Sequence, residues 1–520
     1  MGGRHNNHNS YSIVVKILQF LEMTGGISRS LASARGKIAT VVDAMLSLQP
    51  RVAALEQRYE NELTRQLIHA AARNLADRGD HRIVSAVERR VEPLGRPLRI
   101  GFFGNLANQS YLTCRALRRL GHDAELVIQS NNIDSYLLNS PFWEEQELEV
   151  NSLDDERLSG EGFALPDFVR DVPYDHGAAV RFAGRLSATE EVIDLYRGLA
   201  GRELQPDEAL TLAQWMGQWD YLKAMADYDV VHLSMWPICL AQFSPRPTIV
   251  CPLGGELYIT GFEQNLQGLI CRAGFRMADH IQVCETDYPA FLDRMEVKGP
   301  RSFLPLMVDT DVYKPGAEDA LRMAWQQDVG GEHFLLGVCR QDWLWKGSDK
   351  LIRAFARFYR AGNHSWRLLL QAWGNDLDRS RALVTKLGLD GTVVWLSMCS
   401  KPLLRRRQRA ADVVADQFVM EGYGASVFES LAAAKPVIMS PVPPEAAHHF
   451  RSGPPPLVGA RSEDEIADAI MRMSDAGARF RIGEASRAWV LAEHGYQALA
   501  PRYMEMFEAA YARCQTSYVS

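Results

Sequence analysis

The stretch EGYGASVFESLAAAKPVI, Glu421–Ile438, decides the fold of the second half of the chain. The apolar run DVVADQF precedes it, and the apolar run PVIMS ends it. Between these two expected strands the sequence has a glycine-broken turn and then an apolar segment of helical length. A strand, a turn, a helix and a second strand form one unit of a parallel α/β sheet.

The turn in this stretch has the composition of a phosphate-binding site. Gly422 and Gly424 let the backbone approach a ligand closely, and a helix is expected to begin near Ala425 or Ser426. The free N–H groups and the dipole at a helix N-terminus favour a diphosphate. The stretch therefore predicts a ligand site where the strand passes into the helix.

Two glutamates flank this turn. Glu421 precedes the glycines, so we expect it to point from the strand end into a ligand cleft. For Glu429 two interpretations stay open. It contacts a ligand, or it completes a capping box with Ser426, in which case it only satisfies the helix start.

A second group of charged residues lies in GVCRQDWLWKGSDKLIRAF, residues 337–355. Arg340 and Lys346 follow an expected strand and precede an expected helix in the same domain. Two cations in one loop can neutralise the charge that builds up on a departing diphosphate. The alternative is that both are solvated surface residues.

The wider pattern consists of two successive α/β series joined near VDTDVYKPG, residues 308–316. The first series is expected to have strands at 98–104, 122–128, 229–235, 247–253, 280–284 and 302–308. The second is expected to have strands at 333–338, 366–372 and 393–397, before the opening stretch. The pattern predicts a Rossmann-like domain over 95–312, another over 316–495, and a C-terminal helix over 496–520 that packs back on the first domain.

Residues 1–92 are predicted to form an α-helical appendage. Apolar residues between 27 and 78 follow the spacing of a coiled-coil seam, and Pro50 divides the run into two helices. Self-association through this segment is one interpretation, and a hairpin packed on its own domain is the other. Residues 11–23 are interpreted either as a packed amphipathic helix or as a segment that lies on a membrane surface or on a partner.

Composition limits the classes of function. The 520 residues are 47% hydrophobic and 23% charged, with a net charge of −7, as expected for a soluble multidomain protein without global attraction to nucleic acid. Two local charge clusters stand out: the basic run at 401–409 faces solvent or anionic lipid, and the acidic region 141–171 is expected to be a surface insertion or lid. The eight dispersed cysteines are expected to be reduced core residues, which together with the absence of a signal-like N-terminus favours a cytoplasmic location, with a peripheral place at the inner face of a membrane as the alternative.

The order Arg340-x5-Lys346-Gly347 followed by Glu421-x7-Glu429 resembles the retaining glycosyltransferases of family 4 (group 1), which have the GT-B fold. In the first domain, GNLANQSYLTCRALRRLGHDAELV, DVVHLSMW and PLMVDTDVYKPG are similar to their opening turn and helix, a strand with a histidine at its tip, and the approach to their interdomain linker. The resemblance covers residues 98–510. It implies two tandem Rossmann-like domains of the GT-B class.

The resemblance also implies roles in the donor site. Arg340 and Lys346 would stabilise the leaving nucleoside diphosphate, Glu421 would hold hydroxyls of the donor sugar, and Glu429 would hold the ribose. The backbone around the diphosphate and the sugar would come from a larger set, namely Gly422, Tyr423, Gly424, Ala425 and Ser426, with Gly104 and Asn105 from the first domain.

On the acceptor side the match to the family is incomplete. Gly254, Gly255 and Glu256 keep the usual pattern, but Leu253 stands where many relatives have a histidine. Glu256 or His232 would then orient the acceptor, or no side chain acts as base. A buried, hydrogen-bonded His232 without a role at the site is the alternative.

The function that the resemblance implies is transfer of a hexose-like sugar from a nucleotide-sugar donor to an acceptor hydroxyl, with retention of anomeric configuration. The acceptor is left open among a glycan, a lipid-linked glycan and a small molecule. No metal or other cofactor is implied, because the nearest DxD form, Asp309-Thr310-Asp311, matches the linker instead. Two alternatives remain: a nucleotide-sugar 2-epimerase, and a non-catalytic GT-B partner subunit.

Overall fold

The computed structural model describes residues 91, 93–131, 139–151, 160, 162–174, 218–244, 246–420, 422–441 and 449–516. All of them belong to one compact unit, Ala71–Ser520. The expected coiled coil at 27–78 and the amphipathic segment at 11–23 lie outside the described residues, as does Glu421.

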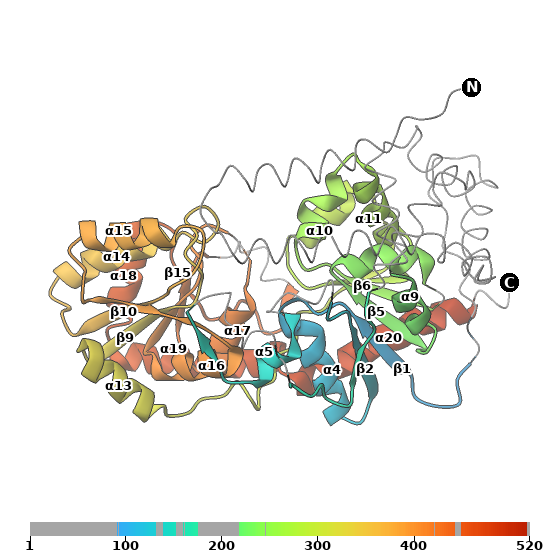
Figure 1. Cartoon of the computed structure of the whole chain (residues 1–520), viewed down its shortest axis with the longest axis horizontal. Helices are drawn as coiled ribbons and strands as arrows, with labels where there is room; N and C mark the ends of the chain where they lie inside the picture. The colour runs from blue at the N-terminus through green and yellow to red at the C-terminus, as the bar shows by residue number, and fades with distance from the viewer. Residues whose placement is uncertain are drawn as a thin grey trace, which may run out of the picture. The chain divides into compact units, whose positions relative to one another are not determined.

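The first domain is built on a seven-stranded parallel sheet with the order β4-β2-β1-β5-β6-β7-β8 (Figure 1). Its strands are β1 (Arg99–Phe103), β2 (Asp123–Ile128), β4 (Val169–Asp171), β5 (Val230–Ser234), β6 (Thr248–Cys251), β7 (His280–Val283) and β8 (Arg301–Phe303). The central strands are buried on both faces, which explains their nearly unbroken apolar sequences.

Two features of this sheet differ from the expectation. Strand β8 ends at Phe303 instead of continuing to residue 308, because Pro305 cannot donate a hydrogen bond to a neighbouring strand. Strand β4 comes from the acidic region that was expected to be a surface insertion, and it pairs with β2. The end of that region is therefore part of the first sheet.

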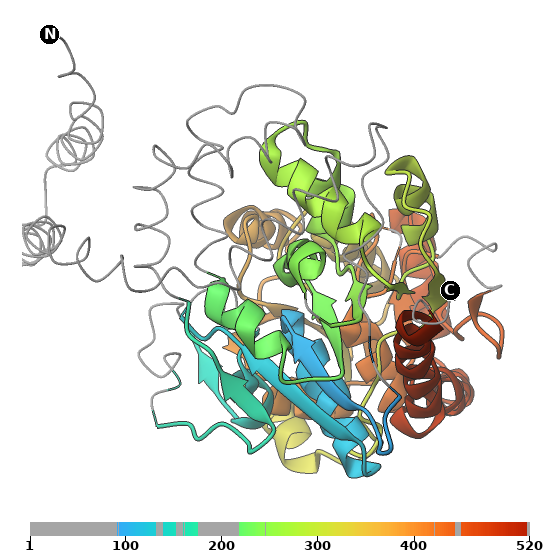
Figure 2. The ribbon, with the colours of Figure 1, turned by 90° about the vertical axis from the view of Figure 1, so that its right-hand side faces the viewer.

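Short and long helices surround the first sheet. They are α4 (Gln109–Arg119), α5 (Pro141–Glu145), α9 (Trp219–Met225), α10 (Gly255–Tyr258), α11 (Leu266–Arg276) and α12 (Tyr288–Arg294), with 3-10 turns at Leu106–Asn108, Trp236–Phe243 and Thr260–Phe262. The last helix of the chain, α20 (Tyr496–Thr516), also contacts α4, β5 and β6. Its side chains Tyr503 and Phe507 are buried in the same core as Phe102, and the dark-red helix can be followed beside the blue strands in Figure 2.

The second domain has a six-stranded parallel sheet with the order β11-β10-β9-β13-β14-β15. Its strands are β9 (His333–Gly337), β10 (Trp366–Gln371), β11 (Val393–Leu396), β13 (Val413–Ala415), β14 (Val437–Met439) and β15 (Val458–Gly459). Because β9 and β13 are neighbours, the loops that follow them meet at one edge of the sheet. This arrangement brings the Arg340–Lys346 loop next to the glycine turn.

The helices of the second domain follow its strands in alternation. They are α13 (Asp319–Val329), α14 (Ser348–Arg360), α15 (Leu377–Lys386), α16 (Lys401–Ala410), α17 (Ala425–Ala432), α18 (Glu463–Arg472) and α19 (Ala476–Glu493). Just after α17, Ala434 has a positive φ of 56°. An alanine thus occupies a left-handed position that usually favours glycine.

Residues 141–151 of the first domain bind residues 397–409 of the second, and we call this contact the interdomain clasp. Strand β3 (Glu149–Val150) pairs antiparallel with β12 (Met398–Cys399), and the Ser400 N–H donates to the Leu148 carbonyl at 2.9 Å. Three ion pairs add to the ladder: Glu144–Arg405, Glu147–Arg406 and Glu149–Arg407.

The clasp corrects two expectations. The basic run does not simply face solvent or lipid, because the first-domain glutamates and Glu318 pair with its arginines. The start of the acidic region is not a solvated loop, because Glu144 is buried. The acidic start of region 141–171 and the basic run at 401–409 therefore neutralise one another across the clasp.

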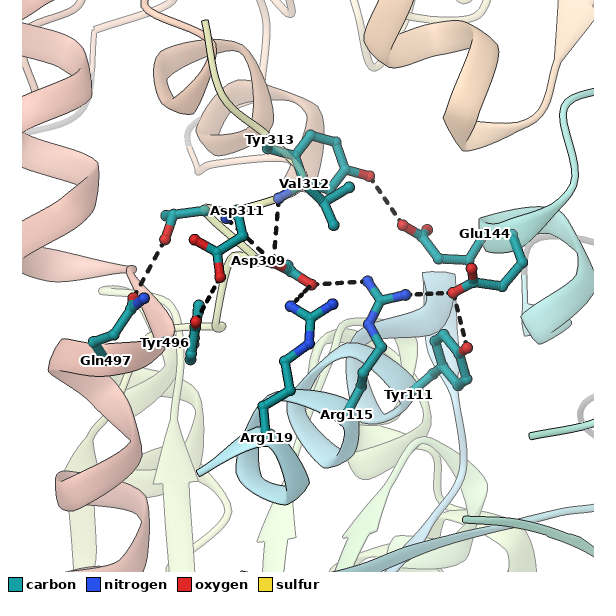
Figure 3. A network of polar contacts seen from close by, with 12 residues as sticks. Tyr111, Arg115, Arg119, Glu144, Asp309, Asp311, Val312, Tyr313, Tyr496 and Gln497 are labelled. Carbon is teal, nitrogen blue, oxygen red and sulfur yellow. Dashed lines mark hydrogen bonds and ion pairs between the residues drawn. The ribbon is translucent and has the colours of Figure 1, made fainter. Parts of the chain in front are cut away.

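The linker between the domains is held by the first domain and by α20. Figure 3 shows Asp309 between the guanidinium groups of Arg115 and Arg119, which donate to its carboxylate at 3.0 and 2.7 Å. Asp311 instead accepts from the Tyr496 hydroxyl at 2.5 Å. The two aspartates of the DxD form therefore have separate structural partners.

Candidate functional site

Residues 422–426, which we call the donor turn after the role expected for it, include the end of the loop that follows β13 and the first two residues of α17. Gly422 has a φ of 122°, and Gly424 is the N-cap residue of α17. Because it is a glycine, it has no side chain that could hydrogen-bond the start of the helix. The Ser426 hydroxyl donates to Asp416 at 2.7 Å, and Ser426 lies inside the helix, whose N-cap is Gly424. The capping-box interpretation of Glu429 is therefore wrong, and the helix begins one residue before Ser426.

Lys346 is connected to this turn through a side chain that the sequence analysis did not single out. Its ammonium group hydrogen-bonds the Gln417 amide oxygen, and the Gln417 amide nitrogen donates to the Gly422 carbonyl at 2.7 Å. The backbone adds to this contact, because the Phe418 N–H donates to the Lys346 carbonyl at 2.8 Å. The loop after β9 and the turn after β13 thus form one polar surface.

Arg340 lies at the start of the same loop. Its guanidinium group pairs with Asp342 at 2.9 Å, and its side chain remains 39% exposed. Asp342 also accepts from the Trp345 N–H at 2.9 Å, so the loop is held in shape by its own carboxylate. Arg340 is therefore positioned and still accessible to an anionic ligand.

Glu429 is buried in the second turn of α17 and forms an ion pair with Lys401 at 2.5 Å. Its other carboxylate oxygen, Oε2, has no hydrogen-bond partner in the part of the chain that the structure describes. Desolvation opposes the charge on Lys401, but attraction to Glu429 and to Glu144 outweighs it, and the pKa of Lys401 is raised. One oxygen of Glu429 is thus structural and the other remains for a ligand.

Glu144 brings a first-domain carboxyl group into this cluster. It accepts from the Tyr313 hydroxyl at 3.2 Å and from Arg405 at 3.3 Å. Burial raises the pKa of Glu144 to about 7, although Lys401 and Arg405 act in the opposite direction. At neutral pH the carboxyl is therefore divided between its charged and neutral forms.

A small cavity adjoins this cluster. Its wall includes Gln109 and Ala425, the first residues of α4 and α17, together with Glu429 and Tyr313. Gln109 Oε1 and Glu429 Oε2 are both buried, and neither has a hydrogen-bond partner among the described residues. Two helix N-termini and two unpaired acceptor atoms converge here, as an anionic group that also carries hydroxyls would require.

The first-domain turn is held tightly by its own residues. Gly104 has a φ of 86°, and a Cβ there would clash with the Ser234 carbonyl. Asn105 is buried, donates to the Asn139 carbonyl at 2.6 Å and accepts from the Tyr111 N–H at 2.9 Å. These contacts shape the loop before α4. Both ends of the Asn105 side-chain amide are hydrogen-bonded within the first domain.

The acceptor-side residues are also engaged within the first domain. His232 is buried in β5, its Nε2 lies 2.9 Å from Gln282 Oε1, and the residue lines a second small cavity. Among the described residues, its Nδ1 has no hydrogen-bond partner. Glu256 accepts from the Leu253 N–H at 2.6 Å in the turn where Gly254 precedes Gly255, and burial raises its pKa. His232 and Glu256 therefore each have a hydrogen-bond partner within the first domain, Gln282 and the Leu253 backbone.

The sequence analysis did not single out four residues of the site region as candidate site residues: Gln417, Asp416, Lys401 and Glu144. Gln417 and Asp416 follow β13 directly, so their place at the carboxyl end of a parallel strand was a usable signal. Lys401 and Glu144 were seen only as members of charge clusters. Their pairing depends on the interdomain clasp, which has no local sequence signal.

Across the described ranges no group of three or more His, Cys, Asp or Glu residues has the geometry of a metal site. Within the same residues, no helix is both long and apolar enough to span a membrane. The eight cysteines are free thiols, and Cys339 lies 3.3 Å from Asp416 behind the donor turn.

Comparisons with known proteins agree with this geometry. Residues 332–476 match the family model described as glycosyl transferases group 1, and the matched range includes both the Arg340 loop and the donor turn. An uncharacterized glycosyltransferase of Methanocaldococcus jannaschii is 28% identical over 202 residues, 36% of this chain and 50% of that protein. D-inositol 3-phosphate glycosyltransferase of Mycolicibacterium smegmatis is 29% identical over 218 residues, 41% of this chain and 47% of that protein, so the matches span about half of either relative.

Solved structures show the same two-domain architecture. Sucrose-phosphate synthase of Thermosynechococcus elongatus superposes with a TM-score of 0.53 at 17% identity, over 80% of this chain and 100% of that one. HepE of Anabaena in complex with UDP-glucose gives 0.54 at 15% identity, over 79% and 100%. The chain has the GT-B fold, and residues 332–476 within it are similar to the glycosyl transferases group 1 family.

Proposed function

We propose that this protein transfers a sugar from a nucleotide-sugar donor to an acceptor hydroxyl, with retention of anomeric configuration. The second domain binds the donor: Arg340 and Lys346 neutralise the diphosphate, and the donor turn presents its backbone N–H groups to it. The free oxygen of Glu429 accepts from the ribose, and Glu421 binds the sugar. No metal takes part.

The connection from Lys346 through Gln417 to Gly422 carries this proposal. A cation fixed beside a helix N-terminus stabilises negative charge as it develops on a leaving group, which is the main requirement of sugar transfer from a diphosphate. The relatives support the same chemistry. Both curated relatives are named as glycosyltransferases, and the Anabaena neighbour was solved with UDP-glucose.

The test is release of nucleoside diphosphate from UDP-glucose, GDP-mannose, ADP-glucose and dTDP-glucose by the full chain. Lys346→Ala and Arg340→Ala should lower the rate by about 100-fold or more, since each removes charge stabilisation of the transition state. Lys386→Ala, an exposed lysine at the end of α15, is the matched control and should retain the rate. Equal rates in all variants, or no release from any donor, would overturn the proposal.

A further inference from the structure

Glu285 is a first-domain residue that faces the donor turn of the second domain. It follows β7, and its Oε2 accepts a hydrogen bond from the Tyr423 N–H at 3.5 Å. A Cβ on Gly422 would lie 3.8 Å from the same oxygen. Gly422 therefore has the Glu285 carboxyl close by, while its own carbonyl is bound by Gln417.

The surroundings of Glu285 keep its carboxyl group neutral. Burial raises the pKa of Glu285 to about 8; the Tyr423 N–H opposes this rise and the nearby Asp287 adds to it. At neutral pH the group is mainly protonated and is a hydrogen-bond donor as well as an acceptor. A neutral carboxyl can lie beside a bound diphosphate without the repulsion that a carboxylate would cause.

Several other described first-domain groups with suitable chemistry already form hydrogen bonds away from the donor turn. Glu256 is bound to the backbone of its own turn, and His232 Nε2 is bound to Gln282. Tyr258 donates to Asp287 at 3.0 Å. Glu285 combines the chemistry needed to bind a hydroxyl with a position against the donor turn.

We propose that Glu285 binds the attacking hydroxyl of the acceptor, an inference that rests on the proposed function. Its carboxyl O–H donates to one lone pair of the attacking oxygen and directs the other toward the anomeric carbon. The bond from that carbon to the diphosphate breaks with its electron pair, and the new carbon–oxygen bond forms. The proton of the hydroxyl passes to an oxygen of the leaving phosphate, so Glu285 keeps its own proton.

The experiment compares Glu285→Ala, Glu285→Gln and the control Asp293→Asn, an exposed carboxylate on α12. With the nucleotide sugar that binds the wild type most tightly, two quantities are measured: the affinity for the free nucleotide, and the rate of nucleotide release with water as the attacking group. Glu285→Ala should lower the rate of nucleotide release at least about tenfold, because the attacking oxygen is no longer oriented. The affinity for the free nucleotide should stay within about twofold of the wild type. Glu285→Gln should restore most of the rate, because an amide N–H replaces the donor.

The other outcomes distinguish a failure of the Glu285 role from a failure of the proposed function. Glu285→Ala with the wild-type rate, or Glu285→Gln as slow as Glu285→Ala, overturns the role of Glu285 alone. A large loss of nucleotide affinity in Glu285→Ala assigns the residue to the donor site and also overturns that role. A wild type that binds no nucleotide, or releases none from the panel, overturns the proposed function and this inference with it.

Discussion

The Glu429 carboxylate lies 2.5 Å from the Lys401 ammonium group, and the two side chains are only 4% and 13% exposed. Removing one partner of a buried pair leaves an uncompensated charge, at a cost of about 3–5 kcal/mol. Lys401→Met should therefore lower the free energy of unfolding by about 3 kcal/mol in chemical denaturation at pH 7. The double variant Lys401→Met/Glu429→Gln should recover much of that loss, and a single variant as stable as the wild type would contradict the pair's importance.

Glu144 predicts a dependence of stability on pH. Its folded pKa of about 7 exceeds the ordinary value of 4.5, so the unfolded chain releases this proton first and unfolding becomes easier as pH rises between those values. The stability of the wild type relative to Glu144→Gln should fall by about 3 kcal/mol from pH 4.5 to pH 7, and change little above pH 8. Denaturation curves of both proteins across this range would show a constant difference if Glu144 were ionised throughout.

Gly104 and Gly121 form a matched pair for a test of packing at the first-domain turn. Their φ values are 86° and 87°, but a Cβ would clash with the Ser234 carbonyl at Gly104 and meet nothing within 4 Å at Gly121. Gly121→Ala should cost about 1 kcal/mol for backbone strain alone. Gly104→Ala should cost a further 1–3 kcal/mol, roughly, for overpacking, and equal losses in the two variants would show that the turn relaxes freely.

Ala434 predicts a stabilising substitution. Its φ of 56° is strained for alanine and not for glycine, so Ala434→Gly should raise the free energy of unfolding by about 0.5–1 kcal/mol. The control is Ala433→Gly, where the φ of −80° gives glycine no advantage and the variant should be neutral or less stable. A loss of stability in Ala434→Gly would indicate that the methyl group contributes packing that outweighs the strain.

The sequence predicted the two parallel sheets well, because strands buried on both faces are continuous apolar runs between turn formers. It also predicted that Arg340 and Lys346 lie in one loop between a strand and a helix of the second domain. The structure brings that loop beside the donor turn, because β9 and β13 are neighbours. These features depend on local pattern and on the rule that parallel strands end at one edge.

The interdomain contacts could not be predicted in the same way. Glu144 and Arg405 are separated by 261 residues, and a cluster of acids or of arginines is ordinarily a solvated surface. Only the fold reveals that the two clusters face each other. The same reason applies to Glu285, whose importance depends on Tyr423, 138 residues later.

Whether the second domain binds a nucleotide at the donor turn can be measured without knowing the acceptor. Thermal unfolding of the full chain would be titrated with UDP, GDP, ADP, TDP and CMP, alongside the Arg340→Ala/Lys346→Ala double variant. Ligand at about 100 times its Kd should stabilise the wild type by about 2.7 kcal/mol, selectively for one base, and the double variant should lose that shift. No shift with any nucleotide, or the same shift in the double variant, would contradict a nucleotide-sugar site at this turn.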